Sequence, residues 1–194
     1  MNVAAASGSI VSLNPKVDFI GGRPAPGTLN LRPATPADLD HLRRWDRDPD
    51  VRASLVDSDW HWETEIHRNP SWREWLIAEV DGRPVGFMQI IDPEHEESKY
   101  WGCMEAGHRA IDIWIGEPDA RSKGYGSRMM EQAIERCFAD PSVHTILIDP
   151  LETNTRARRF YESLGFEYVV RRCFGNDVCS VYKLTRPDDT RGHA

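Results

Sequence analysis

The stretch IDIWIGEPDARSKGYGS, residues 111–127, decides the fold of this chain, because it leads from an apolar segment through a glycine-containing turn toward a helix. Residues 111–115 are apolar apart from Asp112, which predicts a strand that carries one charged side chain. A helix is expected over residues 127–139, where apolar side chains recur on one face. The stretch therefore predicts a strand, a turn and a helix in direct succession.

The turn contains the pattern Arg121-x-x-Gly124-x-Gly126. Glycines let such a turn present backbone N–H groups, and the N-terminus of the next helix adds a positive dipole, so a pyrophosphate would bind here. A Rossmann dinucleotide site is disfavoured because the third glycine is missing, and a P-loop is excluded because no Gly-Lys-Ser/Thr ending follows. Taken alone, the two glycines indicate only a tight turn.

A second pattern, NTRARRFYESLGF, follows at residues 154–166. It predicts a helix over residues 154–164 that ends at Gly165. The β-branched run at residues 145–148, between the two patterns, predicts a buried parallel strand. The two patterns are therefore expected to meet as two helices that flank one strand.

The remaining segments extend this core on both sides. Further strands are expected over residues 28–32, 72–80, 85–91, 166–173 and 179–184, with a helix starting at Thr35 and another within residues 46–69. The order β-α-α-β-β-β-α-β-α-β-β predicts an α/β fold, a mixed β-sheet flanked by helices. Residues 28–186 are expected to form one domain between two tails, residues 1–27 and 187–194.

The composition narrows the classes of function. A net charge of −7 over 194 residues disfavours nucleic-acid binding and fits a cationic partner, although many proteins are mildly acidic for solubility alone. No apolar run approaches the ~20 residues of a membrane span, and the N-terminal segment lacks the features of a signal peptide. The four cysteines and seven histidines show no metal-ligand spacing, so free thiols in the cytoplasm and no metal are expected.

Together, the two patterns resemble the acetyl-coenzyme-A signature of the GNAT acetyltransferase superfamily, over residues 111–166. A closer resemblance, through words such as Asp149-Pro150 and Asn154-x-Arg156-Ala157, is to aminoglycoside 6′-N-acetyltransferases. The resemblance implies the GNAT fold and acetyl-coenzyme A as cofactor. The residues that it assigns to the cofactor are Ile113, Trp114, Ile115, Arg121, Ser122, Lys123, Gly124, Tyr125, Gly126, Ser127, Asn154, Ala157 and Tyr161.

Two residues are predicted to carry the reaction, in which an amine attacks the thioester directly. Asp112 is the candidate base, because the amine must lose a proton and the matching aspartate of the resembling enzymes lies at the acceptor amine. Tyr161 is the candidate acid for the leaving thiolate, as the resembling family places it. The alternatives are structural, an ion-paired carboxylate for Asp112 and a packed ring for Tyr161.

The acceptor side is expected to be an acidic and aromatic wall. Carboxylates crowd the segments that should flank it, and these are Asp57, Asp59, Glu94, Glu96, Glu97, Glu105, Asp149 and Asp177. Flat walls for sugar rings are expected from Trp60, Trp62, Tyr100 and Trp101. Since Asp149 and Asp177 match acidic positions of the resembling enzymes, the predicted substrate-binding residues are Trp101, Asp112, Asp149 and Asp177.

The sequence alone is compatible with several acceptor substrates. The leading hypothesis is an aminoglycoside 6′-N-acetyltransferase with a role in antibiotic resistance, although residues 93–107 and the N-terminal tail depart from those enzymes. The alternatives are a lysine- or hydroxylamine-directed acyltransferase of siderophore synthesis, a protein or peptide acetyltransferase, and a non-catalytic acetyl-coenzyme-A-binding module. Both a monomer and a homodimer are compatible with the sequence.

Overall fold

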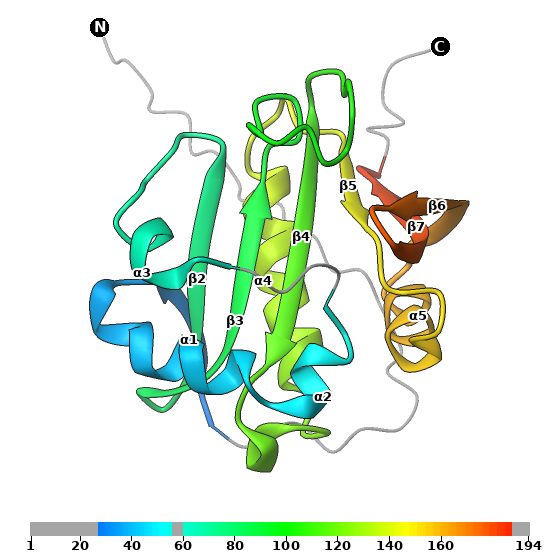
Figure 1. The fold of residues 1–194 in the computed structure, drawn as a ribbon. Helices are drawn as coiled ribbons and strands as arrows, with labels where there is room; N and C mark the ends of the chain where they lie inside the picture. The colour runs from blue at the N-terminus through cyan, green and yellow to red at the C-terminus, as the bar shows by residue number, and fades with distance from the viewer. Residues whose placement is uncertain (1–26, 56–59, 188–194) are drawn as a thin grey trace, which may run out of the picture.

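The computed structural model describes residues 27–55 and 60–187, so Asp57, Asp59 and almost all of both expected tails lie outside the described residues. Its centre is a seven-stranded sheet in the order β1-β2-β3-β4-β5-β7-β6 (Figure 1). Only β4 and β5 are parallel neighbours, which confirms the predicted mixed sheet. The strands are β1 Leu29–Pro33, β2 Arg73–Val80, β3 Arg83–Ile91, β4 His108–Ile115, β5 Thr145–Ile148, β6 Glu167–Phe174 and β7 Asp177–Thr185.

The helices occupy the predicted segments, but their ends differ. The first predicted helix starts as a 3-10 turn, and the second is split in two. α4 begins at Tyr125 rather than at Ser127, because Gly124 takes a φ of +82° and ends the turn just before it. The bounds are η1 Pro36–Asp38, α1 Leu39–Asp46, α2 Pro49–Arg52, α3 Trp62–Glu65, η2 Pro118–Ala120, α4 Tyr125–Phe138 and α5 Thr155–Ser163.

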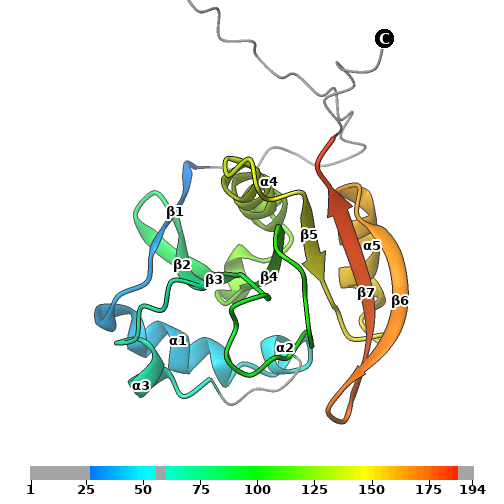
Figure 2. The same cartoon turned by 90° about the horizontal axis from the view of Figure 1, so that it is seen from above.

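The helices cover the two faces of the sheet separately (Figure 2). α4 and α5 pack on one face, where Met129 and Tyr161 are part of the main buried core. α1 and α3 pack on the other face, around an aromatic cluster that includes Trp45 and Trp114. Because side chains alternate along a strand, Asp112 lies on the same face of β4 as Trp114, away from α4.

β4 and β5 form only a short parallel ladder. The register pairs residues 108–110 with residues 145–147, and β4 then continues to Ile115 without pairing to β5. β5 is four residues long and is soon followed by Pro150, which has no N–H to extend a ladder. The two strands therefore separate, and the edge of β4 from Ile111 onward faces a gap.

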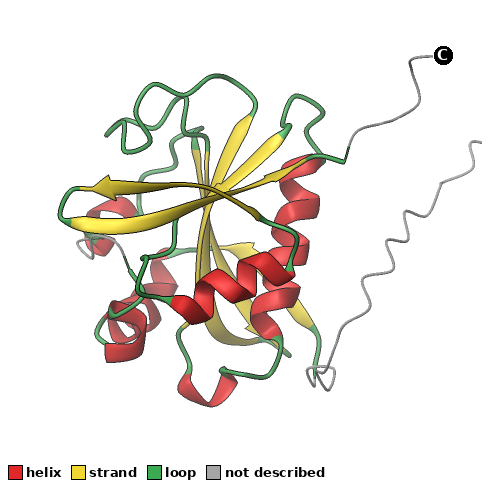
Figure 3. Ribbon diagram, turned by 90° about the vertical axis from the view of Figure 1, so that its right-hand side faces the viewer, coloured by secondary structure: helices red, strands yellow, loops and turns green. Residues whose placement is uncertain are grey.

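The β6–β7 hairpin continues the sheet beyond this gap. β7 pairs with the whole of β5, and β6 forms the outer edge of the sheet. Figure 3 shows the hairpin crossing the direction of the other strands, in keeping with the twist of a sheet. In residues 27–55 and 60–187, no helix combines the length and apolar character needed to cross a bilayer.

Candidate active site

Two cavities meet where β4 and β5 separate. The sheet cavity, about 400 Å³, lies over β2, β3 and β4 and is bounded by the loop of residues 92–107. The loop cavity, about 650 Å³, lies between β4, the start of α4 and α5. Molecules bound in the two cavities would touch at the junction, where the lining residues common to both are Ser54, Ile113, Asn154, Ala157 and Tyr161.

The loop cavity is built around the start of α4. Gly124 caps the helix in a left-handed conformation, and Ser122 also has a positive φ, of 59°. The first N–H groups of a helix have no partner within it, so those of α4 open onto this cavity. Lys123 does not line the cavity, whereas the other predicted cofactor residues do, namely Ile113, Trp114, Ile115, Arg121, Ser122, Gly124, Tyr125, Gly126, Ser127, Asn154, Ala157 and Tyr161.

The guanidinium of Arg121 is occupied by protein partners. It pairs with Asp48 at 2.9 Å and with Asp50 at 2.7 Å. It also donates hydrogen bonds to the carbonyl oxygens of Ile115 and Gly116, each at 3.1 Å. These bonds tie α2 to the turn after β4, so Arg121 shapes the loop cavity. Its guanidinium is already occupied, which leaves the backbone N–H groups of the turn as donors that the cavity presents to an anion.

Arg156 provides a cation at the loop cavity, and no sequence pattern indicated it as a site residue. Its Nη2 lies 3.2 Å from the Ser122 hydroxyl, across the cavity from α5 to the turn. Asn154 sets its position, because the Asn154 side chain caps α5 by accepting the Ala157 N–H at 3.0 Å. The sequence shows an arginine in the first turn of this helix, but exposed arginines are too common for that alone to indicate a ligand.

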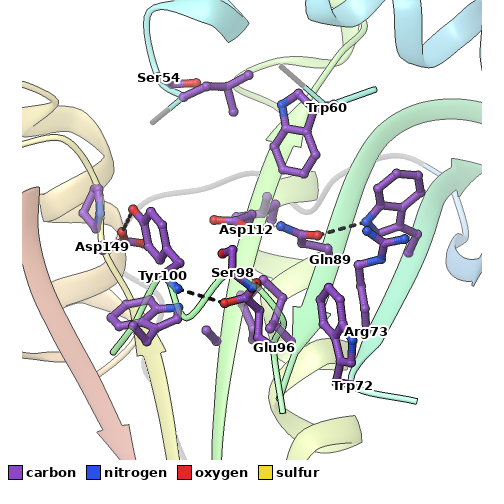
Figure 4. A pocket seen from close by; sticks show the side chains of 18 of the residues that line it. Ser54, Trp60, Trp72, Arg73, Gln89, Glu96, Ser98, Tyr100, Asp112 and Asp149 are labelled. Carbon is purple, nitrogen blue, oxygen red and sulfur yellow. Dashed lines mark hydrogen bonds between the residues drawn. The ribbon is translucent and has the colours of Figure 1, made fainter. Parts of the chain in front are cut away.

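Asp112 projects from β4 into the sheet cavity (Figure 4). Gln89 on β3 donates a hydrogen bond of 2.5 Å from Nε2 to Asp112 Oδ2. Burial raises the pKa of Asp112, and the hydrogen bond from Gln89 partly opposes that effect. Within residues 27–55 and 60–187, the interactions that set its pKa include no cation, which argues against the ion-paired alternative. A carboxylate whose pKa is raised is a stronger proton acceptor, as a general base requires.

Asp149 follows β5 and faces the same cavity. It accepts a hydrogen bond of 2.5 Å from the hydroxyl of Tyr100, whose ring stacks on Phe174 with centroids 4.2 Å apart. Burial and the nearby charge of Asp112 raise the pKa of Asp149 to about 8. The Asp149 carboxyl therefore keeps its proton to a higher pH than an ordinary aspartate does.

Tyr161 stands at the junction of the two cavities. It is 8% exposed, and its ring contacts Phe166 with centroids 5.9 Å apart. Burial raises the pKa of Tyr161, and the charges of Asp112 and Asp149 raise it further, so the phenol stays protonated. Tyr161 therefore combines a packed ring with a protonated phenol at the boundary of the two cavities.

The acidic wall is smaller than predicted. Of the proposed carboxylates in the described residues, Glu96 and Asp149 line the sheet cavity, whereas Glu94, Glu97, Glu105 and Asp177 do not. Asp177 is the first residue of β7 and pairs with Phe174 across the tight β6–β7 turn. That position is set by the hairpin, and it does not bring Asp177 to the cavity.

The carboxylate of Glu96 is occupied mainly by hydrogen bonds within the 92–107 loop. It accepts the backbone N–H groups of Ser98 at 2.6 Å and of Tyr100 at 2.9 Å. These hydrogen bonds fold the 92–107 loop over the sheet, where Trp101 is buried with only 5% exposure. Trp101 thus lines the cavity as predicted, and Glu96 acts in the structure as a support for the loop.

The sheet cavity contains a cation as well. Arg73 on β2 pairs with Glu65 at 2.8 Å, and its guanidinium carbon lies 4.2 Å from the centroid of the Trp75 ring. Trp60 lines the cavity, and Trp62 stacks behind it with ring centroids 5.0 Å apart. The wall is therefore aromatic, as expected, but mixed in charge.

No motif in the sequence indicated Arg73 or Gln89, and Tyr100 was expected as a flat wall but not as a partner of Asp149. Each belongs to a segment of ordinary composition, and only the strand register and the fold of the 92–107 loop bring them to one cavity. Polar residues within otherwise apolar strands were the available signal, since a buried polar side chain needs a partner. That signal selected Asp112 and passed over Gln89, which lies directly opposite it.

Comparison with known proteins gives both sequence and structural relatives. Aminoglycoside N(6′)-acetyltransferase type 1 of Klebsiella pneumoniae is 29% identical over 128 residues, which are 66% of this chain and 63% of the relative. The chain thus spans less than two thirds of that relative's length. Lysine N-acyltransferase MbtK of Mycolicibacterium paratuberculosis is 25% identical over 175 residues, which are 83% of this chain and 75% of the relative.

The fold has close counterparts among solved structures. The structure of AAC(6′)-Ib in complex with ribostamycin and coenzyme A superposes with a TM-score of 0.73 at 25% identity, covering 86% of this chain and 99% of that chain. A family model described as the acetyltransferase (GNAT) domain matches residues 34–172, which include β2 to β5 and both α4 and α5. The chain belongs to the GNAT acetyltransferase domain family.

Proposed function

We propose that this chain is an N-acetyltransferase that moves an acetyl group from acetyl-coenzyme A to a primary amine. The observation that carries the proposal is the junction of two cavities, one opening on a helix N-terminus and the other holding Asp112 and Asp149, with Tyr161 lining both. The relatives support it, since the Klebsiella protein is an aminoglycoside acetyltransferase and AAC(6′)-Ib holds coenzyme A.

The loop cavity suits coenzyme A in shape and chemistry. The first N–H groups of α4 and the guanidinium of Arg156 would hold the pyrophosphate. Ala157 and Phe160 give an apolar wall for the pantetheine arm. The edge of β4 from Ile111, which β5 does not pair, offers backbone groups to the amides of that arm. When bound there, acetyl-coenzyme A supplies an acyl group activated as a thioester.

The side chains at the junction would then manage two protons. Asp112 accepts a proton from the acceptor ammonium, because only the neutral amine has the lone pair that attacks. Tyr161 donates a proton to the departing sulfur, since its raised pKa keeps it protonated. A cysteine nucleophile is not needed, and burial raises the pKa of both Cys137 and Cys179 to about 12, which disfavours a reactive thiolate.

We infer that the acceptor is a cationic amine, with the 6′-amine of an aminoglycoside as the leading candidate. Asp112, joined by Asp149 once it ionises, provides negative charge for an ammonium group, and Trp60 and Trp101 provide flat apolar walls. The relatives named above include two proteins with aminoglycosides in their names or complexes. An enzyme with this activity would confer antibiotic resistance, which drug susceptibility of a host expressing the chain would measure.

Arg73 favours a second candidate, a lysine-type acceptor. A guanidinium in the cavity attracts a carboxylate and repels an additional ammonium group. The relative MbtK is a lysine N-acyltransferase, and its match covers 83% of this chain. An amino acid would place its side-chain amine at Asp112 and its carboxylate toward Arg73, although Glu65 competes for that guanidinium.

An acceptor screen decides between these candidates. Purified protein is mixed with acetyl-coenzyme A and one acceptor at a time, and released thiol is followed with a chromogenic disulfide. The acceptors are kanamycin, spermidine, lysine, hydroxylysine and a peptide with a free N-terminus. We expect the highest kcat/KM with kanamycin. Turnover of lysine or hydroxylysine alone would select the second candidate, and no thiol release with any acceptor would contradict the proposed function.

The exposed thiols and the proposed cofactor indicate the cellular compartment of the enzyme. Cys103 and Cys173 are exposed and unpaired, as is usual in a reducing compartment, so we infer the cytoplasm as its location. Acetyl-coenzyme A as cofactor agrees with that location. Whether the enzyme is a monomer or a homodimer is measured by sedimentation of the full chain with and without coenzyme A.

A further inference from the structure

Gln89 lies between Trp75 and Asp112 in one row across three strands. The register of β2 with β3 pairs Trp75 with Gln89, and that of β3 with β4 pairs Gln89 with Asp112. Trp75 donates from Nε1 to Gln89 Oε1 at 2.9 Å, and Gln89 donates from Nε2 to Asp112 Oδ2 at 2.5 Å. Figure 4 shows Gln89 next to Asp112. The three side chains thus form a continuous hydrogen-bond relay on the cavity side of the sheet.

Trp75 determines which way the Gln89 amide points. An indole N–H can only donate, so it selects the carbonyl oxygen of the amide and turns the NH₂ group toward Asp112. Gln89 is 7% exposed, and the reversed amide would set its oxygen against a carboxylate oxygen and its NH₂ against the indole N–H. Burial therefore makes a single orientation of the amide strongly preferred.

We propose that Gln89, oriented by Trp75, is a positioning residue that holds Asp112 Oδ2 and leaves Oδ1 to receive the proton of the acceptor amine. The inference rests on the proposed function, because it assigns Asp112 as the base. Trp75 would then have two roles, because its ring packs in the aromatic cluster and its indole N–H orients Gln89.

The relay matters because few other interactions stabilise the ionised carboxylate of Asp112. The hydrogen bond from Gln89 is the one interaction that lowers the pKa of Asp112 against the effect of burial. Asp149, Tyr100 and Tyr161 interact with Asp112 through its charge, and all three are themselves acids. The titratable and charged residues that share the cavity with Asp112 are His61, Glu65, Arg73, Glu96, Tyr100, Asp149 and Tyr161.

The first test compares pH profiles of kcat/KM for wild type, Gln89→Met, Trp75→Phe and Trp62→Phe. Loss of a hydrogen bond to a buried carboxylate raises its pKa, so the acid limb of the Gln89→Met profile should move up by about one to two pH units. Trp75→Phe should move the limb in the same direction by less, because the amide remains but is free to turn. Trp62→Phe is the matched control, since Trp62 packs in the same aromatic cluster and does not contact Gln89 through a hydrogen bond.

The second test measures Asp112 without turnover. The ¹³Cγ signals of labelled aspartates are titrated by NMR in the full chain, and Asp112→Asn assigns the signal. The Asp112 midpoint should rise in Gln89→Met and in Trp75→Phe, and stay unchanged in Trp62→Phe. Folded variants whose midpoints and pH profiles match wild type would overturn the relay. A shifted midpoint in a chain that acetylates no acceptor would support the relay and contradict the proposed function instead.

Discussion

The loop cavity and the sheet cavity share a boundary at Tyr161, but they are built in different ways. The loop cavity comes mostly from two continuous stretches, residues 113–127 and 153–161, and the donors proposed for an anion are mainly backbone N–H groups. The sheet cavity takes side chains from three strands, a long loop and the residue after β5. A motif can encode the first kind of site, because backbone donors depend on local conformation. The second kind depends on which side chains the sheet register sets side by side.

The two cavities also differ in charge. The loop cavity offers helix N–H groups and Arg156, which suit an anion. The sheet cavity holds Asp112 and Asp149, whose pKa values are raised by burial, together with the paired cation Arg73. This contrast predicts that variants in one cavity change cofactor binding and that variants in the other change turnover or acceptor binding.

The largest effect is expected from Asp112→Asn in the sheet cavity. General base catalysis contributes about 10²–10⁴-fold, so kcat should fall within that range, whereas the Kd of coenzyme A should stay unchanged. Stopped-flow or steady-state kinetics gives kcat, and calorimetry gives Kd. A variant that loses coenzyme A affinity together with turnover would show that the two cavities are not independent.

Tyr161→Phe tests the proposed acid role of Tyr161, the tyrosine that lines both cavities. If Tyr161 is the acid, kcat should fall by about 10²-fold or more, with the Kd of coenzyme A nearly unchanged, because phenylalanine keeps the ring contact with Phe166. The measurement is kcat across pH beside a melting curve. Full activity at every pH would reduce Tyr161 to a packed ring.

Gly124→Val addresses the loop cavity. Gly124 has a φ of +82°, which a β-branched residue adopts only at a strain of about 1–3 kcal/mol, so the Kd of acetyl-coenzyme A should rise about tenfold or more. Gly175→Val is the matched control, because Gly175 has a φ of +56° in the β6–β7 turn and does not line either cavity. Calorimetry should show a comparable loss of Tm in both variants and weakened cofactor binding only in Gly124→Val.

Asp149→Asn is expected to act on acceptor binding and on stability. The KM of a cationic acceptor should rise about tenfold, as for loss of a contact made in ground and transition states alike. In wild type, that KM should fall as pH rises through about 8, because Asp149 becomes charged there. This pH dependence should be absent in Asp149→Asn, and kinetics between pH 6 and 9 would reveal whether it persists.

The stability effect of Asp149→Asn has the opposite sign to its effect on binding. The carboxyl ionises in the folded chain only near pH 8, far above its ordinary pKa, so folding binds a proton between those values. The contribution of Asp149 to stability is therefore present below its ordinary pKa and is lost as pH rises toward 8. Melting curves should show a larger gain in Tm for Asp149→Asn at pH 8 than at pH 4.

The smallest effect is expected from Arg156→Gln. Its guanidinium is exposed and borders the turn at Ser122, so an ion pair with a phosphate would be screened by solvent. The Kd of coenzyme A should rise only a few-fold, by less than about 1 kcal/mol, and the difference should shrink at high salt. A change in kcat without a change in Kd would place Arg156 outside the cofactor contacts.

Sequence alone determined the elements that depend on local patterns. The turn at Gly124, the cap at Asn154 and the apolar alternation of the strands follow from residues a few positions apart, so the mixed sheet and the loop cavity were predictable. The position of Asp112 on its strand was readable as well, because a charged residue among apolar ones is conspicuous. Local conformation carries this information since helix capping and strand alternation act over short distances.

The contacts within the sheet cavity depend on the tertiary structure, although several of its lining residues, such as Asp112, Asp149 and Trp101, were expected from the sequence. The tertiary structure placed Gln89 beside Asp112 and left Asp177 at a hairpin. It also engaged the Arg121 guanidinium with Asp48 and Asp50, which lie far from it in the sequence. Strand register and loop packing join residues that are distant in the chain, and their energies depend on partners that no single segment contains. For that physical reason, motifs could predict the segments that line the loop cavity, whereas the contacts between side chains in the sheet cavity required the tertiary structure.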